Sequence, residues 1–132
     1  QVMNTIPALH TNELTTENLS TLTAKIQEFH KEMVRNPLQK MPLLPEIASR
    51  MNVSMSTFKA VFKLMYGCSP YQYYLDIKFA YAKQILRSGK YTIKEVSELV
   101  GYSQSAKFVQ KFREREGQTP LRYASSYKKK IK

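Results

Sequence analysis

The chain has 132 residues, of which 42% are hydrophobic, and its 21 lysines and arginines against 10 acidic residues give a formal net charge of +11. This length allows one domain or two small lobes with a real core, and it excludes a large enzyme. The charge indicates an anionic partner, chiefly nucleic acid, and it is uneven: residues 101–132 hold nine basic and two acidic side chains, whereas residues 1–36 hold three and four.

Helical spacing dominates the N-terminal part of the chain. Residues 1–14 show no sustained periodicity, and we interpret them as a tail or a linker from an upstream region. Thr15 or Thr16 then begins a helix that Pro37 ends. The apolar face of this helix recurs at intervals of three and four residues, at Leu19, Leu22, Ile26, Phe29 and Met33.

Two shorter helices and one long helix follow. The first begins near Leu44 and tolerates Pro45 in its first turn, where an N–H would have no intrahelical partner. Ser54 can cap the second helix, and Gly67 ends it. A long helix then spans about residues 70–87. Strict alternation nowhere runs long enough for a strand, so the sequence predicts an all-α fold.

The second half of the chain repeats the first. Residues 44–54 align with residues 93–103 at an offset of 49, and residues 58–73 align with residues 108–123 at an offset of 50. Each copy consists of a short helix, a turn and a second helix, which is a helix-turn-helix arrangement. We place the two motifs at about 43–66 and 92–116, with the long helix joining them.

The residue types in the repeat fit this arrangement. Ala48 and Ser97 are small, so the second helix of each motif can cross closely over the first. Asn52 and Gly101 stand in the turn, where a positive φ is tolerated best by these two residue types. The outer face of each second helix is then free to be polar.

Two segments, LPEIASRMNVSMSTFKAVFKLMYGCSPYQYY and TIKEVSELVGYSQSAKFVQKFREREGQTPLRY, together resemble the C-terminal DNA-binding domain of the AraC/XylS transcriptional regulators. The resemblance covers about residues 20–124. Its most specific marks are Ile93, Val96, Gly101-Tyr102-Ser103, Phe108, Phe112, Gly117 and Thr119-Pro120, in that order and spacing.

The resemblance implies that residues 15–132 form seven helices in two lobes, each lobe with one helix-turn-helix motif. It implies that the two second helices enter adjacent major-groove segments of double-stranded DNA, roughly 34 Å apart. It also implies bacterial transcription regulation and a separate upstream effector-sensing or dimerising domain. RNA polymerase is a candidate second partner near Leu44 and Lys90, and activation and repression both stay open.

The chain departs from the family pattern at several positions. The family often has Arg where Ala60 and Gln110 stand, so no base preference carries over. Glu116 replaces a usual aromatic residue, which we interpret as a structural change at the frayed end of its helix. Ser97 replaces the usual Ala, and Lys78 the usual Arg.

Helical spacing divides each second helix of the repeat into an inward and an outward face. We expect outward residues near the helix starts to read bases: Ser56, Lys59 and Ala60, then Ser105, Ala106, Val109 and Gln110. We expect phosphate contacts from Lys63, Lys111 and Arg113, and from the helix start at Thr92. Gln110 suits adenine, and the apolar side chains suit a thymine methyl.

Other residues have structural interpretations that involve no DNA contact. The four phenylalanines of the second helices are core residues, not platforms for stacked bases. Lys83 is interpreted as solvated surface, and His30 as a surface residue without a partner. The C-terminal YKKKIK is either a phosphate-seeking arm or a solubilising tail.

Two other classes of function are an enzyme and a protein-binding domain. The sequence holds no Ser/His/Asp or Cys/His constellation and no glycine-rich phosphate loop, so we expect no enzyme, cofactor or metal. Cys68 is the one cysteine, and no apolar run reaches the roughly 18 residues of a membrane span, so we expect a cytoplasmic chain without a membrane partner. A helical domain whose basic face binds an acidic protein is the alternative.

Overall fold

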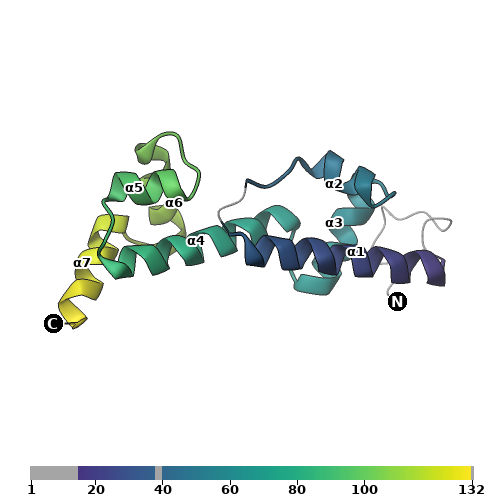
Figure 1. The fold of residues 1–132 in the computed structure, drawn as a ribbon, viewed down its shortest axis with the longest axis horizontal. Coiled ribbons are helices and arrows are strands. Elements are labelled where there is room, and N and C mark those ends of the chain that lie inside the picture. Colours follow the sequence, from purple (N-terminus) through teal and green to yellow (C-terminus); the bar gives the residue numbers. More distant parts are fainter. Residues whose placement is uncertain (1–14, 38–39, 132) are drawn as a thin grey trace. The chain divides into compact units, whose positions relative to one another are not determined.

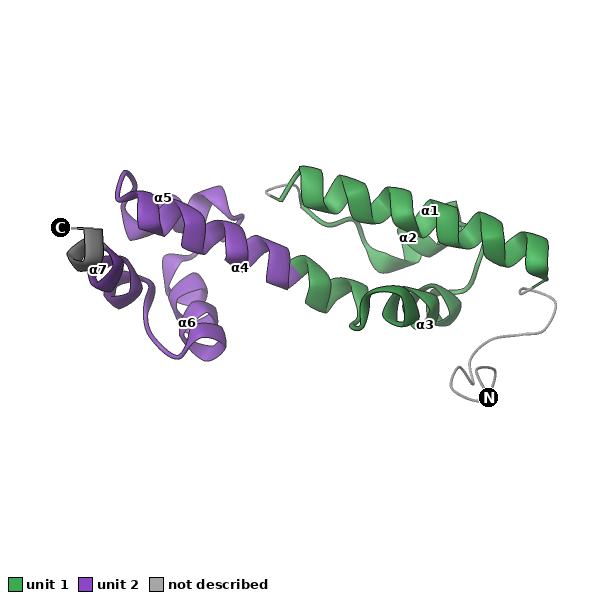
Figure 2. Ribbon diagram, turned by 90° about the horizontal axis from the view of Figure 1, so that it is seen from below, with its two compact units in different colours: residues 1–74 green, residues 75–132 purple. Residues whose placement is uncertain are grey.

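The computed structural model describes residues 15–37 and 40–131, and within these ranges it contains seven α-helices and no strand (Figure 1). The chain divides into two compact units, residues 1–74 and 75–132 (Figure 2). Helix α4 (Pro70–Ser88) begins in the first unit and ends in the second. The all-α prediction is confirmed, while the tail assigned to residues 1–14 lies outside the described residues.

Helix α1 (Thr16–Arg35) begins where the sequence predicts. Thr15 caps it, because its Oγ1 accepts the N–H of Asn18 at 3.1 Å. Leu22, Ile26 and Met33 form its buried face. Spacing of three and four residues therefore identified the buried face, although Phe29 on it is half-buried and Leu19 near the helix start is 40% exposed.

The first helix-turn-helix motif consists of α2 (Leu44–Arg50) and α3 (Met55–Tyr66). Asn52 in the turn between them has a φ of 60°, as predicted for this position. Ser54 caps α3 by accepting the Thr57 N–H at 3.1 Å. Gly67 ends α3 in the left-handed region with a φ of 85°.

Aromatic rings fill the core of the first unit. Phe58 and Phe62 are fully buried, as predicted, and each makes an edge-to-face contact with Phe29 of α1. Ala48 of α2 is 3% exposed, which fits the expected close crossing of α2 and α3. The apolar rings and this small residue fix α3 from its inner side.

The second unit repeats the motif with α5 (Ile93–Leu99) and α6 (Ser105–Glu116), and α7 (Pro120–Ile131) follows. Gly101 has a φ of 91°, and Gly117 ends α6 with a φ of 80°. The backbone of the YKKKIK segment up to Ile131 is helical, and the side chains of residues 128–132 lie outside the described part.

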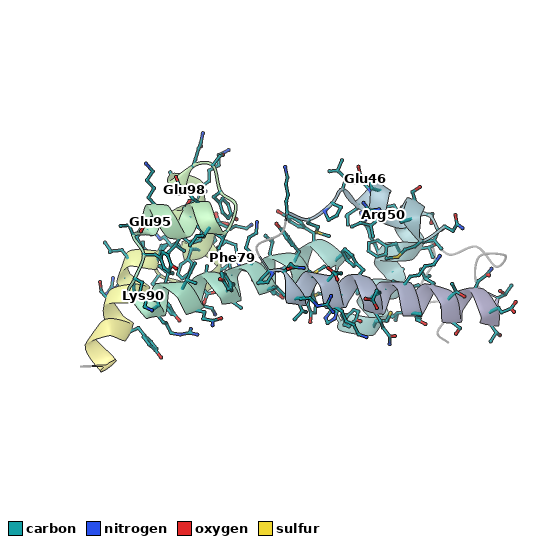
Figure 3. The ribbon with its side chains drawn as sticks, in the orientation of Figure 1. Glu46, Arg50, Phe79, Lys90, Glu95 and Glu98 are labelled. Carbon is teal, nitrogen blue, oxygen red and sulfur yellow. The ribbon has the colours of Figure 1, made fainter. Side chains whose placement is uncertain are left out.

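The core of the second unit centres on Phe79 of α4, labelled in Figure 3. Its ring stacks on Phe108, with centroids 5.8 Å apart, and also contacts Phe112. Phe108 and Phe112 are fully buried, which confirms their prediction as core residues. Helix α6 is thus fixed from its inner side as α3 is.

Candidate nucleic-acid interface

The outer face of α3 carries the residues that the sequence predicts for DNA contact in the first unit. Ser56, Lys59 and Lys63 are exposed, and Ala60 is half-buried. They stand at positions i, i+3, i+4 and i+7 of one helix, so they lie on one face, opposite the buried Phe58. The structure therefore brings these four residues together.

The outer face of α6 has the same arrangement. Ala106, Gln110 and Arg113 are exposed and Val109 is half-buried, again at positions i, i+3, i+4 and i+7. Ser105, the first residue of the helix, is half-buried beside this face. The two outer faces thus differ in residue identity and agree in register.

An acidic residue, Glu114, lies at the edge of the α6 face. The Gln110 side-chain amide donates to Glu114 Oε2 at 3.3 Å, and Lys111 Nζ lies 4.0 Å from Glu114 Oε1. Lys111 is half-buried and stands to the side of the Ala106–Arg113 face by helical spacing. Glu114 thus contacts two residues, Gln110 and Lys111, that the sequence predicts for DNA contact.

Thr92 caps α5 as the sequence predicts. Its Oγ1 accepts the Glu95 N–H at 3.1 Å, and Glu95 Oε1 accepts the Thr92 N–H at 2.9 Å, which completes a capping box. Thr92 is exposed, but it lies on α5 and not on the outer face of α6.

Three further exposed residues that the sequence did not predict for DNA contact adjoin these faces. Met55, the first residue of α3, is 39% exposed, and Leu64 is 55% exposed near the end of that helix. Lys107 is exposed in the first turn of α6, three residues before Gln110. Helical spacing alone could have identified Lys107, whereas the exposure of Leu64 and Met55 depends on the packing of the unit.

Aromatic contacts hold the C-terminal end of α3, and one of them corrects the interpretation of His30. His30 of α1 is half-buried: its ring stacks on Tyr66 at 4.1 Å, and its Nε2 lies 2.7 Å from the Tyr73 hydroxyl. Burial lowers the pKa of the His30 imidazole. Burial, and then the nearby Tyr73, raise the pKa of Tyr66. His30 is therefore a packing residue, not a surface residue without a partner.

Ion pairs hold the C-terminal end of α6. Arg115 Nη2 lies 2.5 Å from Asp76 Oδ1, and Lys83 Nζ lies 3.2 Å from Glu116 Oε1. The interpretation of Lys83 as solvated surface is therefore wrong, because its side chain is 32% exposed and paired. Glu116, placed at a frayed helix end by sequence reasoning, joins α6 to α4.

No group of three His, Cys, Asp or Glu residues in the described ranges could hold a metal ion. No helix among the described residues is long and apolar enough to cross a membrane.

Comparisons with known proteins agree with this architecture. A family model described as a helix-turn-helix domain matches residues 47–126. The chain is 33% identical over 90 residues to the probable transcriptional regulator LumQ of Photobacterium leiognathi, a match that covers 68% of this chain and 36% of LumQ. It is 33% identical over 94 residues to the virulence regulon transcriptional activator VirF of Yersinia enterocolitica, covering 71% of this chain and 34% of VirF. The chain thus spans about a third of the length of these curated relatives.

Solved structures show the same fold. The DNA-binding domain of AdpA, a global transcriptional factor crystallised with a target DNA, matches with a TM-score of 0.72 at 21% identity, covering 80% of this chain and 95% of that one. An AraC-type regulator from Chromobacterium violaceum matches with a TM-score of 0.67 at 24% identity, covering 80% and 93%. These neighbours share the fold, and the family match over residues 47–126 with its two helix-turn-helix motifs shows that the chain belongs to the AraC/XylS family of bacterial transcriptional regulators, of which it is a helix-turn-helix DNA-binding domain.

Proposed function

We propose that this chain reads a specific double-stranded DNA sequence with both motifs, α3 and α6 each entering one of two successive major-groove segments. The observation that carries the proposal is the matched register of their outer faces. Each face presents residues at i, i+3, i+4 and i+7, and each is backed by two fully buried phenylalanines. A rigid helix with a small polar outer face is the element that fits a major groove.

The residues divide into two roles in this proposal. Base reading falls to the N-terminal turns of each helix: Ser56, Lys59 and Ala60 on α3, and Ser105, Ala106, Val109 and Gln110 on α6. Phosphate contacts fall to Lys63, Lys111 and Arg113, and to the start of α5 at Thr92. Counterion release by the lysines and the arginine gives affinity without sequence preference, and the base-reading residues add discrimination.

Glu114 has a specific place in this mechanism. Its carboxylate accepts the Gln110 amide and lies near Lys111, so DNA must compete with it for both groups. Removing its charge with Glu114→Gln should therefore raise the affinity for any DNA, because a carboxylate near phosphates is repelled. Glu114→Gln should leave the preferred sequence unchanged, since Glu114 itself is not assigned to a base.

The proposal extends to the full-length regulator that contains this domain. We propose a cytoplasmic transcription factor without catalytic activity, in which an upstream domain senses an effector or dimerises. RNA polymerase is proposed as a second partner beside DNA, through exposed charged residues near the starts of the two motifs. Glu46 and Arg50 on α2, and Glu95 and Glu98 on α5, lie exposed there (Figure 3).

The test is selection from a pool of random duplexes at moderate salt. A sequence reader enriches a defined motif, and each wrong base pair then costs about 1–3 kcal/mol. Gln110→Ala should relax the preference at one position only, and its control, Gln84→Ala on the exposed side of α4, should relax none. A helical domain that binds an acidic protein would enrich no motif, and its DNA retention would vanish with salt.

A further inference from the structure

We propose that Asp76 and Lys83 of α4 position α6 for base reading, by pairing with Arg115 and Glu116. We name these four residues the α4–α6 clamp. The inference rests on the proposed role of α6 as a reading helix, and it assigns a specificity role to residues that do not touch DNA.

The clamp consists of two ion pairs, Asp76–Arg115 and Lys83–Glu116, and the acid comes first on α4 but second on α6. On α4 the acid, Asp76, precedes the base, Lys83, by seven residues, so the two lie on one helix face. On α6 the base, Arg115, directly precedes the acid, Glu116. Because Asp76 and Lys83 carry opposite charges, a shift of α6 that carried Arg115 toward Lys83 or Glu116 toward Asp76 would replace attraction with repulsion. The pairing therefore defines one register of α6.

The clamp is tied to the core as well as to charge. The Arg115 guanidinium lies 5.1 Å from the centroid of the Phe79 ring, and that ring stacks on Phe108 of α6. The α6 side of the clamp is the more buried side: Arg115 is 18% exposed and its partner Asp76 53%, and Glu116 is 20% exposed and its partner Lys83 32%. Both partners of the surface pair Glu32–Arg35 are about half-exposed or more, at 49% and 62%. Partly buried pairs are screened less by salt and hold a more defined geometry than surface pairs.

Two arginines in the same turn of α6 have different surroundings. Arg113 is exposed on the outer face and is proposed to contact phosphate. Arg115 is turned to α4, and its buried Nε has no hydrogen-bond partner in the described part of the chain. Loss of Arg113 should therefore lower affinity for all sequences, and disruption of the clamp should change which sequence is preferred.

The first unit provides the contrast. The repeat aligns Arg115 with Met65 and Glu116 with Tyr66. Tyr66 is held by ring contacts to His30 and Tyr73, at 4.1 and 5.7 Å, and no ion pair takes part among the described contacts at this helix end. Disruption of the clamp should thus affect the half-element read by the second unit and spare the other.

The experiment is a charge-swap cycle on Lys83 and Glu116, read by selection from random duplexes. Lys83→Glu and Glu116→Lys each place like charges opposite one another, and the double variant restores attraction at the net charge of the wild type. Calorimetry and circular dichroism verify folding. Asp76→Asn, at a half-exposed position, provides a milder variant if a single swap unfolds the unit. Arg113→Ala is the matched control.

Each single swap, or Asp76→Asn, should lower the preference for the second half-element on the order of tenfold, about the loss of one good base contact, with the first half-element retained. The double swap should recover the preference, and Arg113→Ala should weaken binding without changing it. The proposed role of the clamp would be overturned if the single swaps left the preference for the second half-element unchanged. It would also be overturned if a folded double variant did not recover that preference. A wild-type chain that selects no second half-element would instead overturn the proposed function of α6, and the clamp with it.

Discussion

Replacing Ser97 with Ala should stabilise the second unit. Ser97 is fully buried in α5, and its hydroxyl oxygen has no hydrogen-bond partner in the described structure. A buried, unpaired hydroxyl costs about 1–3 kcal/mol, and Ala also favours a helix by roughly 0.5 kcal/mol over Ser. We therefore expect Ser97→Ala to raise the free energy of unfolding by about 1–2 kcal/mol, allowing for relaxation around the smaller side chain.

The assay is differential scanning calorimetry of the whole chain, in which the two units can unfold in separate transitions. For a domain of this size, about 1–2 kcal/mol corresponds to a rise in Tm of roughly 5–10 °C. DNA affinity should not change, because Ser97 lies on the inner side of the motif. Ser125→Ala, at an exposed position of α7, is the control for helix propensity alone.

The opposite substitution can be made at the equivalent position of the repeat. Ala48 occupies the equivalent position of the first unit and is 3% exposed. Ala48→Ser should therefore introduce the same unpaired hydroxyl and lower the stability of the first unit by a similar amount. A drop in Tm for Ser97→Ala, or no change beyond that of Ser125→Ala, would refute the reasoning and indicate that the hydroxyl is satisfied in solution.

Three further predictions concern charge, pH and the joining helix. Lys63→Ala should weaken binding about equally for all duplexes and reduce the salt slope of affinity by about 1, measured by anisotropy titrations at stepped salt. Burial lowers the pKa of the His30 imidazole, so the unfolded chain binds the proton more readily than the folded chain. The stability of the first unit should therefore fall as the pH drops from the usual histidine pKa toward the lowered pKa of the folded chain. His30→Phe should abolish this pH dependence, measured by calorimetry at stepped pH. Ala80→Gly, at an exposed position of α4, should weaken specific binding more than non-specific binding, and equal weakening would argue against α4 as a rigid spacer.

Local patterns predicted the helices and the turns well. Thr15, Ser54 and Thr92 were predicted at helix starts from residue type, and each caps its helix. Asn52 and Gly101 were predicted in the turns, and both have a positive φ. These features depend on residues within one or two turns of each other, so spacing and residue type are sufficient to find them.

Contacts between distant residues were not predictable in the same way. His30 and Tyr73 are 43 residues apart, and Asp76 and Arg115 are 39 apart. No periodicity within one helix specifies which face of another helix it meets. The isolated appearance of His30 and Lys83 in the sequence therefore led to wrong interpretations, and only the packed structure supplied their partners.

The candidate site was predictable in part. The outward position of Lys59, Lys63 and Gln110 followed from the inward position of the phenylalanines, and their exposure agrees with it. The contact between Gln110 and Glu114 lies within one helix at spacing i, i+4, so the sequence allowed it. Whether these residues contact DNA stays a prediction.

The most direct test of joint recognition by α3 and α6 varies the spacing between the two half-elements of the selected duplex. The two half-elements are separated by insertions of about 5 and about 10 base pairs, which correspond to roughly a half and a full helical turn, and the affinity of the chain is measured for each. If α3 and α6 read one DNA face together, the half-turn insertion should reduce binding to the level of a single half-element. Affinity that is unchanged by either insertion would contradict joint reading and show that one motif alone recognises the sequence.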